Sequence, residues 1–183
     1  MQGKDDFMDV VDAIRTVLAV RSYKDTPVPD EVIREILEAG RLTASAGNRQ
    51  PWNFVVVTDR DVLQALADHS EGHGPYVNKA AFAVAVVVDK TTLGISDASR
   101  AIQSMVLAAW VRGVGSNWVG FSDMLTEINP ILGIPEDLDV VAVLPFGYPA
   151  DESLGKGIKK RKPLEEIVHW GSWGQHDAPD SAT

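Results

Sequence analysis

Nine consecutive residues, from Ala80 to Val88, are apolar, and this run limits the possible folds more than any other feature of the chain. The run is rich in valine and too short for most helices, so it predicts a β-strand. It contains no polar residue, whereas a strand with one face in water alternates polar and apolar residues. We therefore expect a strand that is buried on both of its faces.

A long helix is predicted after this strand. Ser96 or Asp97 suits the cap of the helix, which would reach about Arg112. Its apolar residues surround most of the helix instead of forming one stripe, which is typical of a helix that is buried or lies at an interface. These residues are Ala101, Ile102, Met105, Val106, Ala108, Ala109 and Trp110.

Further helices and strands are predicted on either side. Apolar residues at helical spacing predict helices over residues 6–18, 29–40 and 59–69. Ser122 suits the cap of another helix before Pro130. Short apolar runs predict strands over residues 53–58, 116–121 and 140–146. Strands and helices alternate as in an α/β chain, but this pattern does not fix the direction of the strands.

The composition excludes several classes of function. The 183 residues suffice for one domain, and their formal net charge of −9 argues against a nucleic-acid partner. The chain has no cysteine, so thiolate catalysis, Fe–S clusters and disulfides are excluded. No apolar run is long enough to cross a membrane, and the polar start differs from a signal peptide. We therefore expect a cytoplasmic protein with no membrane partner.

The composition also divides the chain into three parts. We expect residues 1–6 to be a flexible N-terminus and residues 7–170 to form the folded domain. From Gly171 onward the sequence is polar and contains Pro and Gly. Residues 171–183 are therefore expected to be a flexible or partner-wrapping tail.

The segment Ser45-Ala46-Gly47-Asn48-Arg49-Gln50-Pro51-Trp52 carries the strongest chemical signal. It places two primary amides, Asn48 and Gln50, two residues apart and just before a predicted strand. A planar heterocycle with alternating hydrogen-bond donors and acceptors needs such groups. The alternative is an ordinary loop between a helix and a strand, in which Gly47 permits a positive φ and Asn48 bonds its own backbone.

Two other clusters have simple interpretations. Residues 159–162 read Lys-Lys-Arg-Lys in an acidic chain, which indicates either a solvated surface or an anion site. His69 and His73 stand four residues apart, but Gly72 and Gly74 would break the helix that such a pair of metal ligands needs. We therefore predict no metal site.

Taken together, several motifs resemble the nitroreductase family of flavoproteins. Ser45–Trp52 is similar to the Ser–Asn–Gln–Pro–Trp signature of that family. Residues 21–29 resemble its Arg-x-aromatic and Pro-Val-Pro segment, and residues 113–118 resemble its Gly-x-Gly-Ser-x-Trp turn. Gly147-Tyr148-Pro149 and then Lys159–Leu164 match its closing pattern. The motifs follow the family order over nearly the whole chain.

The resemblance implies an α+β, three-layer fold with a central mixed, mainly antiparallel sheet flanked by helices. It also implies a homodimer packed through the long apolar helices, with FMN at the interface and NAD(P)H as electron donor. The flavin would pass electrons by a ping-pong hydride mechanism to a small organic acceptor, such as a nitroaromatic or a quinone, without a catalytic side chain. The residues implied to bind FMN are Arg21, Ser45, Asn48, Gln50, Gly115, Ser116, Lys159 and Arg161.

The same resemblance assigns roles to these residues. Arg21 would reach the ribityl chain or a pyrimidine carbonyl, and Ser45, Asn48 and Gln50 would bond or order the polar edge of the ring. Gly115 and Ser116 would bring backbone close to the ring, and Lys159 with Arg161 would hold the phosphate. Candidates for the pocket walls, with core packing as the alternative, are Trp52, Trp118 and Phe121.

One segment departs from the family pattern. The family usually has an Arg and a Ser on the first helix for the phosphate, where this chain has Val17, Leu18 and Ala19. Lys159 and Arg161 would then hold the phosphate alone, unless Arg15 or Lys24 reaches in. If these cations do not suffice, FMN binding is weak or the ligand differs, and the departure favours a flavin-binding or structural homologue with little turnover. A specialised relative, such as a flavin-dependent dehydrogenase, is a separate alternative.

Overall fold

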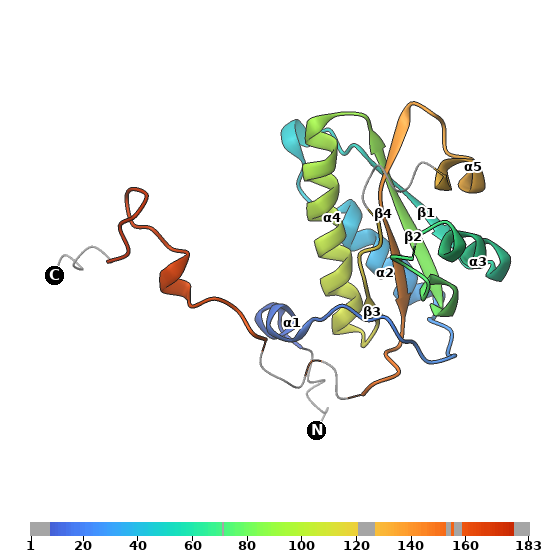
Figure 1. The fold of residues 1–183 in the computed structure, drawn as a ribbon, viewed down its shortest axis with the longest axis horizontal. Coiled ribbons are helices and arrows are strands. Elements are labelled where there is room, and N and C mark those ends of the chain that lie inside the picture. The colour runs from blue at the N-terminus through green and yellow to red at the C-terminus, as the bar shows by residue number, and fades with distance from the viewer. Residues whose placement is uncertain (1–7, 71, 121–126, 153–154, 156–158, 178–183) are drawn as a thin grey trace, which may run out of the picture.

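The computed structural model describes residues 8–70, 72–120, 127–152, 155 and 159–177. A four-stranded sheet lies between two layers of helices (Figure 1). Residues 159–177 form an arm that leaves this body at the carboxyl end. The strands are β1 (Trp52–Val57), β2 (Phe82–Asp89), β3 (Gly115–Ser116) and β4 (Leu138–Gly147). The α-helices are α1 (Val10–Thr16), α2 (Asp30–Arg41), α3 (Arg60–Asp68), α4 (Thr92–Val111) and α5 (Ile128–Leu132).

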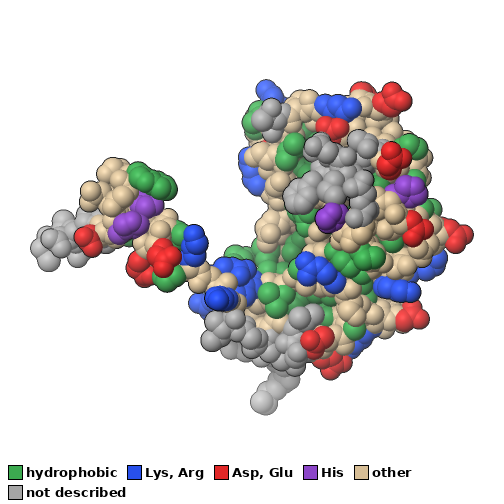
Figure 2. All heavy atoms as spheres, viewed as in Figure 1, with side chains coloured by type: hydrophobic (Ala, Val, Ile, Leu, Met, Phe, Trp, Pro, Cys, Tyr) green, Lys and Arg blue, Asp and Glu red, His purple; other side chains and the backbone are tan. Residues whose placement is uncertain are grey.

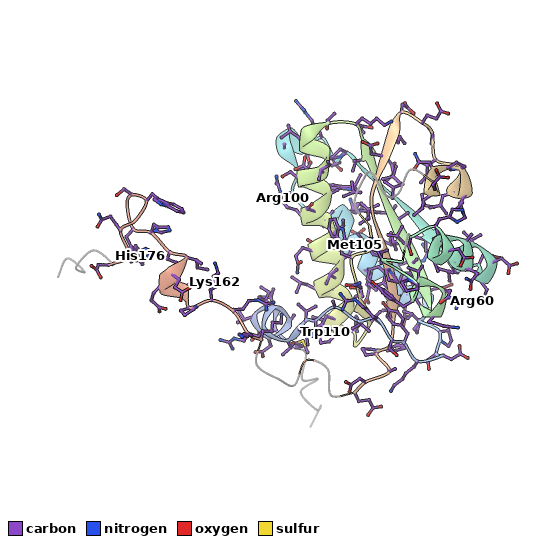
Figure 3. The ribbon with its side chains drawn as sticks, viewed as in Figure 1. Arg60, Arg100, Met105, Trp110, Lys162 and His176 are labelled. Carbon is purple, nitrogen blue, oxygen red and sulfur yellow. The ribbon has the colours of Figure 1, made fainter. Side chains whose placement is uncertain are left out.

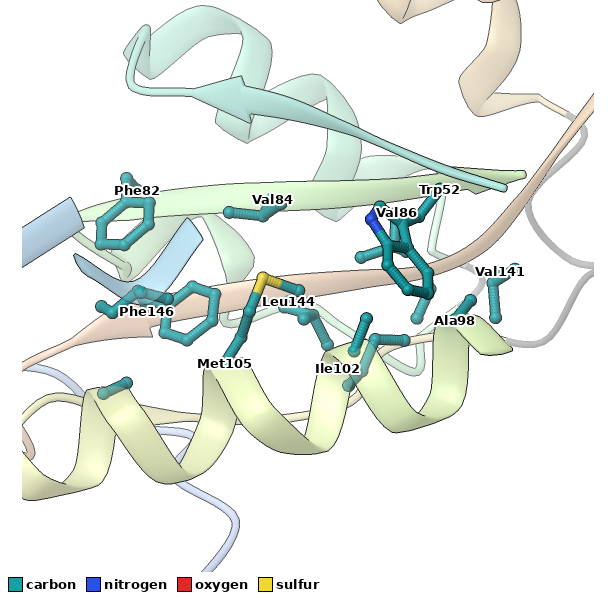
Figure 4. Close-up of a cluster of buried hydrophobic side chains, with 14 of the residues drawn as sticks. Trp52, Phe82, Val84, Val86, Ala98, Ile102, Met105, Val141, Leu144 and Phe146 are labelled. Atoms are coloured by element: carbon teal, nitrogen blue, oxygen red, sulfur yellow. The ribbon is translucent and has the colours of Figure 1, made fainter. Parts of the chain in front are cut away.

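The central strand β2 explains the layers. Its residues Phe82–Val88 are all buried, as the apolar run predicts. Phe82, Val84 and Val86 point to the face covered by α2 and α4, where Phe82 stacks on Phe146 with ring centroids 5.0 Å apart (Figure 4). The alternating residues Ala83, Ala85 and Val87 belong to the core on the other face, together with residues of α3 and α5. Burial on both faces is thus confirmed.

The sheet has the order β1-β2-β4-β3, and all its paired strands are antiparallel. The α+β fold that the family resemblance implied is therefore confirmed. The one parallel pairing in the described residues is an isolated bridge between Ala19 and Ser116. The apolar segments alone predict strands but not their relative directions, because these directions depend on the connections between the strands.

The start of α4 differs from the sequence-based expectation. Neither Ser96 nor Asp97 caps the helix, because the side chain of Thr91 accepts the Gly94 N–H and starts the helix at residue 92. Asp97 lies inside the helix with only 1% of its side chain exposed. The prediction failed because three residues in this stretch can cap a helix, and only the local hydrogen bond selects one.

Two shorter elements also differ from expectation. The strand predicted over 116–121 is only two residues long, and Val119 then bridges back to Val143. The helix expected to precede Pro130 instead contains Pro130 near its start, where a missing N–H costs no helical bond. The predicted cap at Ser122 and the N-terminal segment 1–6 lie outside the described residues. Within those residues, no helix combines the length and apolarity that crossing a membrane requires.

Leu144→Ala tests the double-faced core. Leu144 on β4 is fully buried against α4, so truncation leaves a cavity and should lower the free energy of unfolding by about 3 kcal/mol. Val56 on the outer strand β1 is 39% exposed, and Val56→Ala should cost less than about 1 kcal/mol. Urea denaturation measures both. Equal losses in the two variants would contradict the layered core.

Candidate functional site

The residues predicted to bind a cofactor lie at opposite ends of the sheet. The loop of residues 45–50 precedes Trp52, which pairs with Val88. The segment around Arg21 lies near the other end, where Val57 pairs with Ala83. The two ends of β1 are about 17 Å apart at the usual rise per residue. Figure 1 shows the same separation, with the loop beside the first turns of α4 and α1 beside its last turns.

The loop of residues 45–50 has an unusual backbone. Gly47, Asn48 and Gln50 all adopt a positive φ, of 59°, 55° and 50°. The Ser45 hydroxyl accepts the Gln50 N–H at 2.9 Å, and the Gln50 amide donates to the Asn48 carbonyl at 3.2 Å. Asn48 and Gln50 are exposed. The loop thus holds two amide side chains at the surface in a conformation that most residues avoid.

Gln50 opens onto a broad groove between α2 and β1. The groove has a volume of about 800 Å³, and Trp52 and Phe54 line its apolar part. Trp52 itself is 8% exposed and packs against Ile102 and Ala98 of α4 (Figure 4). Trp52 was interpreted either as a pocket wall or as a core residue. Because most of its surface is buried in the core, core packing is its main role.

Arg21 lies at a second cavity of about 410 Å³ at the other end of the sheet. The lining is polar and contains three cations and one carboxylate: Arg21, Ser22, Tyr23, Asp25, Arg60, Asn78 and Lys79. The Arg60 guanidinium donates to the carbonyls of Ala80 and Ala81, at 2.6 and 3.0 Å, so it helps to shape the cavity. Sequence reasoning found Arg21 but missed the other two cations, because they belong to separate elements.

Asn78 gives this cavity its clearest chemical feature. Its Nδ2 donates to Gln64 Oε1 at 2.8 Å, but its buried Oδ1 has no hydrogen-bond partner. An unpaired buried acceptor is costly unless a ligand donates to it. Asn78 thus adds a polar residue to a cavity that also contains three cations and the carboxylate of Asp25. One weak signal of Asn78 was available in the sequence, since it is a polar residue just before the apolar strand.

Tyr23 anchors the Arg21 segment to the sheet. Its hydroxyl donates to the Val20 carbonyl at 2.7 Å, and its side chain is 9% exposed. Burial, and to a lesser extent the neighbouring Tyr76, raises the pKa of Tyr23 far above the ordinary tyrosine value, while Arg21 opposes this. Tyr23 is therefore a neutral hydrogen-bond donor at neutral pH, and its bond to the Val20 carbonyl holds the segment that carries Arg21.

Gly115 and Ser116 lie in β3 beside this segment. A Cβ on Gly115 would come within 2.3 Å of Val20 Cγ2, so only glycine fits there. The Ser116 carbonyl accepts the Val20 N–H at 2.8 Å, and Ser116 is buried. These contacts hold the Arg21 segment against the sheet. Their predicted approach to a flavin stays a prediction.

Lys159 and Arg161 lie where the arm leaves the body, and Figure 2 shows Lys and Arg side chains gathered at this root. Lys159 Nζ donates to the Ile14 carbonyl at 2.7 Å, and the Arg161 guanidinium contacts the Lys160 carbonyl. Partial burial, and then the charge of Arg161, lowers the pKa of Lys159. Mutual repulsion of two cations favours an anion beside them.

The segment that departs from the family pattern, residues 17–19, has no polar side chain of its own. Leu18 and Ala19 are exposed and Val17 is half-buried. The two suggested substitutes are engaged elsewhere, since Arg15 pairs with Asp12 at 3.5 Å and Lys24 with Glu152 at 2.7 Å. Lys159 lies beside α1 through its bond to Ile14, and the role of Lys159 and Arg161 at a phosphate stays a prediction.

The remaining predicted pocket walls differ in their surroundings. Trp118 is 38% exposed, and its Nε1 donates to the Gly120 carbonyl at 2.8 Å, which leaves part of the indole ring on the surface. Phe121 lies outside the described residues. A role for Trp118 at a ligand stays a prediction.

Comparison with known proteins identifies the family. The model of the nitroreductase family matches residues 15–94 and 88–148, so the chain belongs to the nitroreductase family. It is 35% identical to a protein of Methanothermobacter thermautotrophicus, provisionally named an NADH dehydrogenase/NAD(P)H nitroreductase, over 82% of this chain and 83% of that one. It is 36% identical to a protein of the same name from Archaeoglobus fulgidus, over 76% and 84% of the two chains.

A solved structure agrees with this family. An FMN-dependent nitroreductase from Clostridium difficile superposes with a TM-score of 0.82 and 25% identity. The match covers 89% of this chain and 99% of that one. The two chains therefore share the arrangement of the sheet and its helices along almost their whole length.

Arg161→Gln tests the coupling of the two cations at the root of the arm. Removing a neighbouring positive charge favours the protonated amine, so the pKa of Lys159 should rise toward the ordinary lysine value. NMR titration of ¹³C-labelled lysine side chains measures it. Lys162→Gln is the control and should leave the pKa of Lys159 unchanged. A fall, or no change, in the Arg161 variant would show that the two charges do not interact.

Proposed function

We propose that this protein is an FMN-dependent oxidoreductase that transfers electrons from NAD(P)H to a small organic acceptor. The observation that carries the proposal is the polar cavity in which Arg21 lies with Asn78 and with two further cations, Arg60 and Lys79. Membership of the nitroreductase family and the likeness to an FMN-dependent structure support it. An acceptor of nitroaromatic or quinone type is the class that we propose.

The residues present fit FMN by their chemistry. The flavin ring carries an N–H between two carbonyls, so it offers acceptors for the cation Arg21 and a donor for the polar residues that share its cavity. Lys79 adds a positive charge to the same cavity. A cation near the pyrimidine edge favours the reduced flavin, which carries negative charge there. Lys159 and Arg161 would hold the phosphate.

The flavin supplies the hydride chemistry when bound, and the protein residues bind and orient it. Arg21 is held in place through Tyr23 and the pairing of Val20 with Ser116. No side chain of the described site is needed as an acid or base. Trp118 would limit the space above the ring for a planar acceptor.

The proposed active form is a homodimer, because one chain cannot bring both groups of residues onto one flavin. The loop of residues 45–50 and the Arg21 cavity lie at opposite ends of β1. In a twofold dimer, the loop of one copy can complete the cavity of the other. The proposed site therefore combines Ser45, Asn48 and Gln50 from one copy with Arg21 and the phosphate-binding cations from the second.

Exposed apolar surfaces support a partner. α1 exposes Val10 at 64% and Ile14 at 54%, which is unusual for a helix that borders a core. The arm carries further exposed apolar side chains and leaves the body of its own chain (Figure 1). These are Leu164, Ile167, Trp170 and Trp173, of which Trp173 is 88% exposed. We propose that this arm packs on the second copy.

The visible spectrum of the purified protein tests the function. With FMN added, we expect a bound flavin band that NADH or NADPH bleaches under anaerobic conditions and that a quinone then restores. Bound flavin without bleaching would indicate a binding protein with little turnover, which is the alternative that Val17–Ala19 raises. Failure to bind FMN would end both proposals.

Mixing two defective variants tests the two-chain site. Lys159→Ala with Arg161→Ala should weaken FMN binding by about a hundredfold, because two charge-assisted contacts are lost. Gln50→Ala should also weaken FMN binding, because it removes one of the two amide side chains that the loop presents. After subunit exchange, about a quarter of the sites should regain normal affinity, because half of the dimers then contain one intact site. Fluorescence titration with FMN measures this fraction. Absence of recovery would place both groups in one chain.

A further inference from the structure

Asp97 is a buried carboxylate that the proposed binding residues do not include. It lies in the second turn of α4 and is 1% exposed. Both of its oxygens accept the backbone N–H of Ala46, at 3.2 and 3.1 Å, and one lies 3.0 Å from the Arg100 guanidinium. Arg100 is half exposed on the outer side of α4 (Figure 3). Burial of a carboxylate is costly, so these contacts must maintain it.

The contact between Asp97 and Ala46 lies at the start of the turn from which the two amide side chains project. Ala46 is the first residue of the short 3-10 turn that carries Gly47 and Asn48, and its N–H has no carbonyl partner within that turn. The next residues then take the positive φ angles described above. A left-handed backbone at Asn48 and Gln50 persists only where surrounding contacts hold it. Asp97 supplies the charged contact among these.

A second bond fixes the entry of the loop to the same helix. Thr43 and Ser104 share a hydrogen bond between their hydroxyl groups, at 2.8 Å. Ser45 and Gln50 close the loop internally. Thr43 and Ser104 thus locate the start of the loop, while Asp97 fixes the turn from which both amide side chains project.

We propose that Asp97 is a positioning residue for the cofactor: through the Ala46 N–H it holds the loop in the conformation in which Asn48 and Gln50 meet the flavin. The proposal rests on the proposed function. In the homodimer, Asp97 of one copy then acts on the flavin held by the cavity of the other. The required feature is the hydrogen-bond acceptor, since Arg100 can be satisfied by water.

Asp97→Ala and Asp97→Asn separate the acceptor from the charge. Asp97→Ala removes the acceptor and should weaken FMN binding by about tenfold, the effect of one lost hydrogen bond to a charged group. Asp97→Asn keeps an oxygen for the Ala46 N–H, so its affinity should stay within about threefold of the wild type. Fluorescence titration measures both, and amide hydrogen exchange at Ala46 should be faster in the alanine variant alone.

Thr91→Ala is the matched control on the same helix. It also removes a side-chain oxygen that accepts a backbone N–H, but this N–H belongs to Gly94 at the start of α4 and not to the loop of residues 45–50. It should lower the melting temperature and leave FMN affinity unchanged. If FMN affinity falls with melting temperature in both variants alike, Asp97 acts only through stability and the proposal is wrong.

Subunit mixing adds a measurement, the recovery of FMN binding, whose result would not depend on the second variant if Asp97 had only a structural role. Asp97→Ala should regain FMN binding when mixed with the Lys159→Ala, Arg161→Ala double variant, and should not regain it when mixed with Gln50→Ala. If the wild type binds FMN and Asp97→Ala binds it equally well, the role of Asp97 is overturned and the proposed function stays intact. A wild type that does not bind FMN would instead overturn the proposed function.

Discussion

Burial of β2 on both faces determines the rest of this structure. One strand contributes side chains to two cores, so α2 and α4 must cover one face of the sheet, and α3 and α5 the other. With both faces covered, polar chemistry is left to the two ends of the sheet. The loop before β1 and the Arg21 cavity occupy these two ends. The separation of the candidate binding groups is therefore a direct result of the layered fold.

The helix α4 links the two ends. Near its start, Asp97 holds the loop of residues 45–50, and near its end Trp110 donates from Nε1 to Thr16 of α1 at 2.9 Å. These contacts are about 20 Å apart along the helix. Because α4 is packed against the sheet along its length, it fixes both groups in one rigid body. In the proposed homodimer, each end would meet the second copy without first being ordered, which lowers the entropic cost of association.

The sequence predicts most of the fold but less of the site. Val84 and its neighbours reveal their strand because no polar residue interrupts them, and Asp59 caps α3 as its position suggests. The start of α4 was missed because Thr91 competes with Ser96 and Asp97 as a cap. Asn78 and Arg60 were missed because a cavity joins residues from separate elements, and such joining depends on tertiary structure. No periodicity could reveal that Asp97 faces a loop fifty residues earlier.

The exposed tryptophans of the arm have a consequence for how this protein is handled. In the proposed homodimer, the apolar side chains of this outstretched segment would be removed from water only when the second copy is bound. Stability then includes a bimolecular contribution, so the midpoint of thermal unfolding would climb as the protein is concentrated and drop on dilution. In the cell, the rate of synthesis would thereby help to set how much of the protein stays folded.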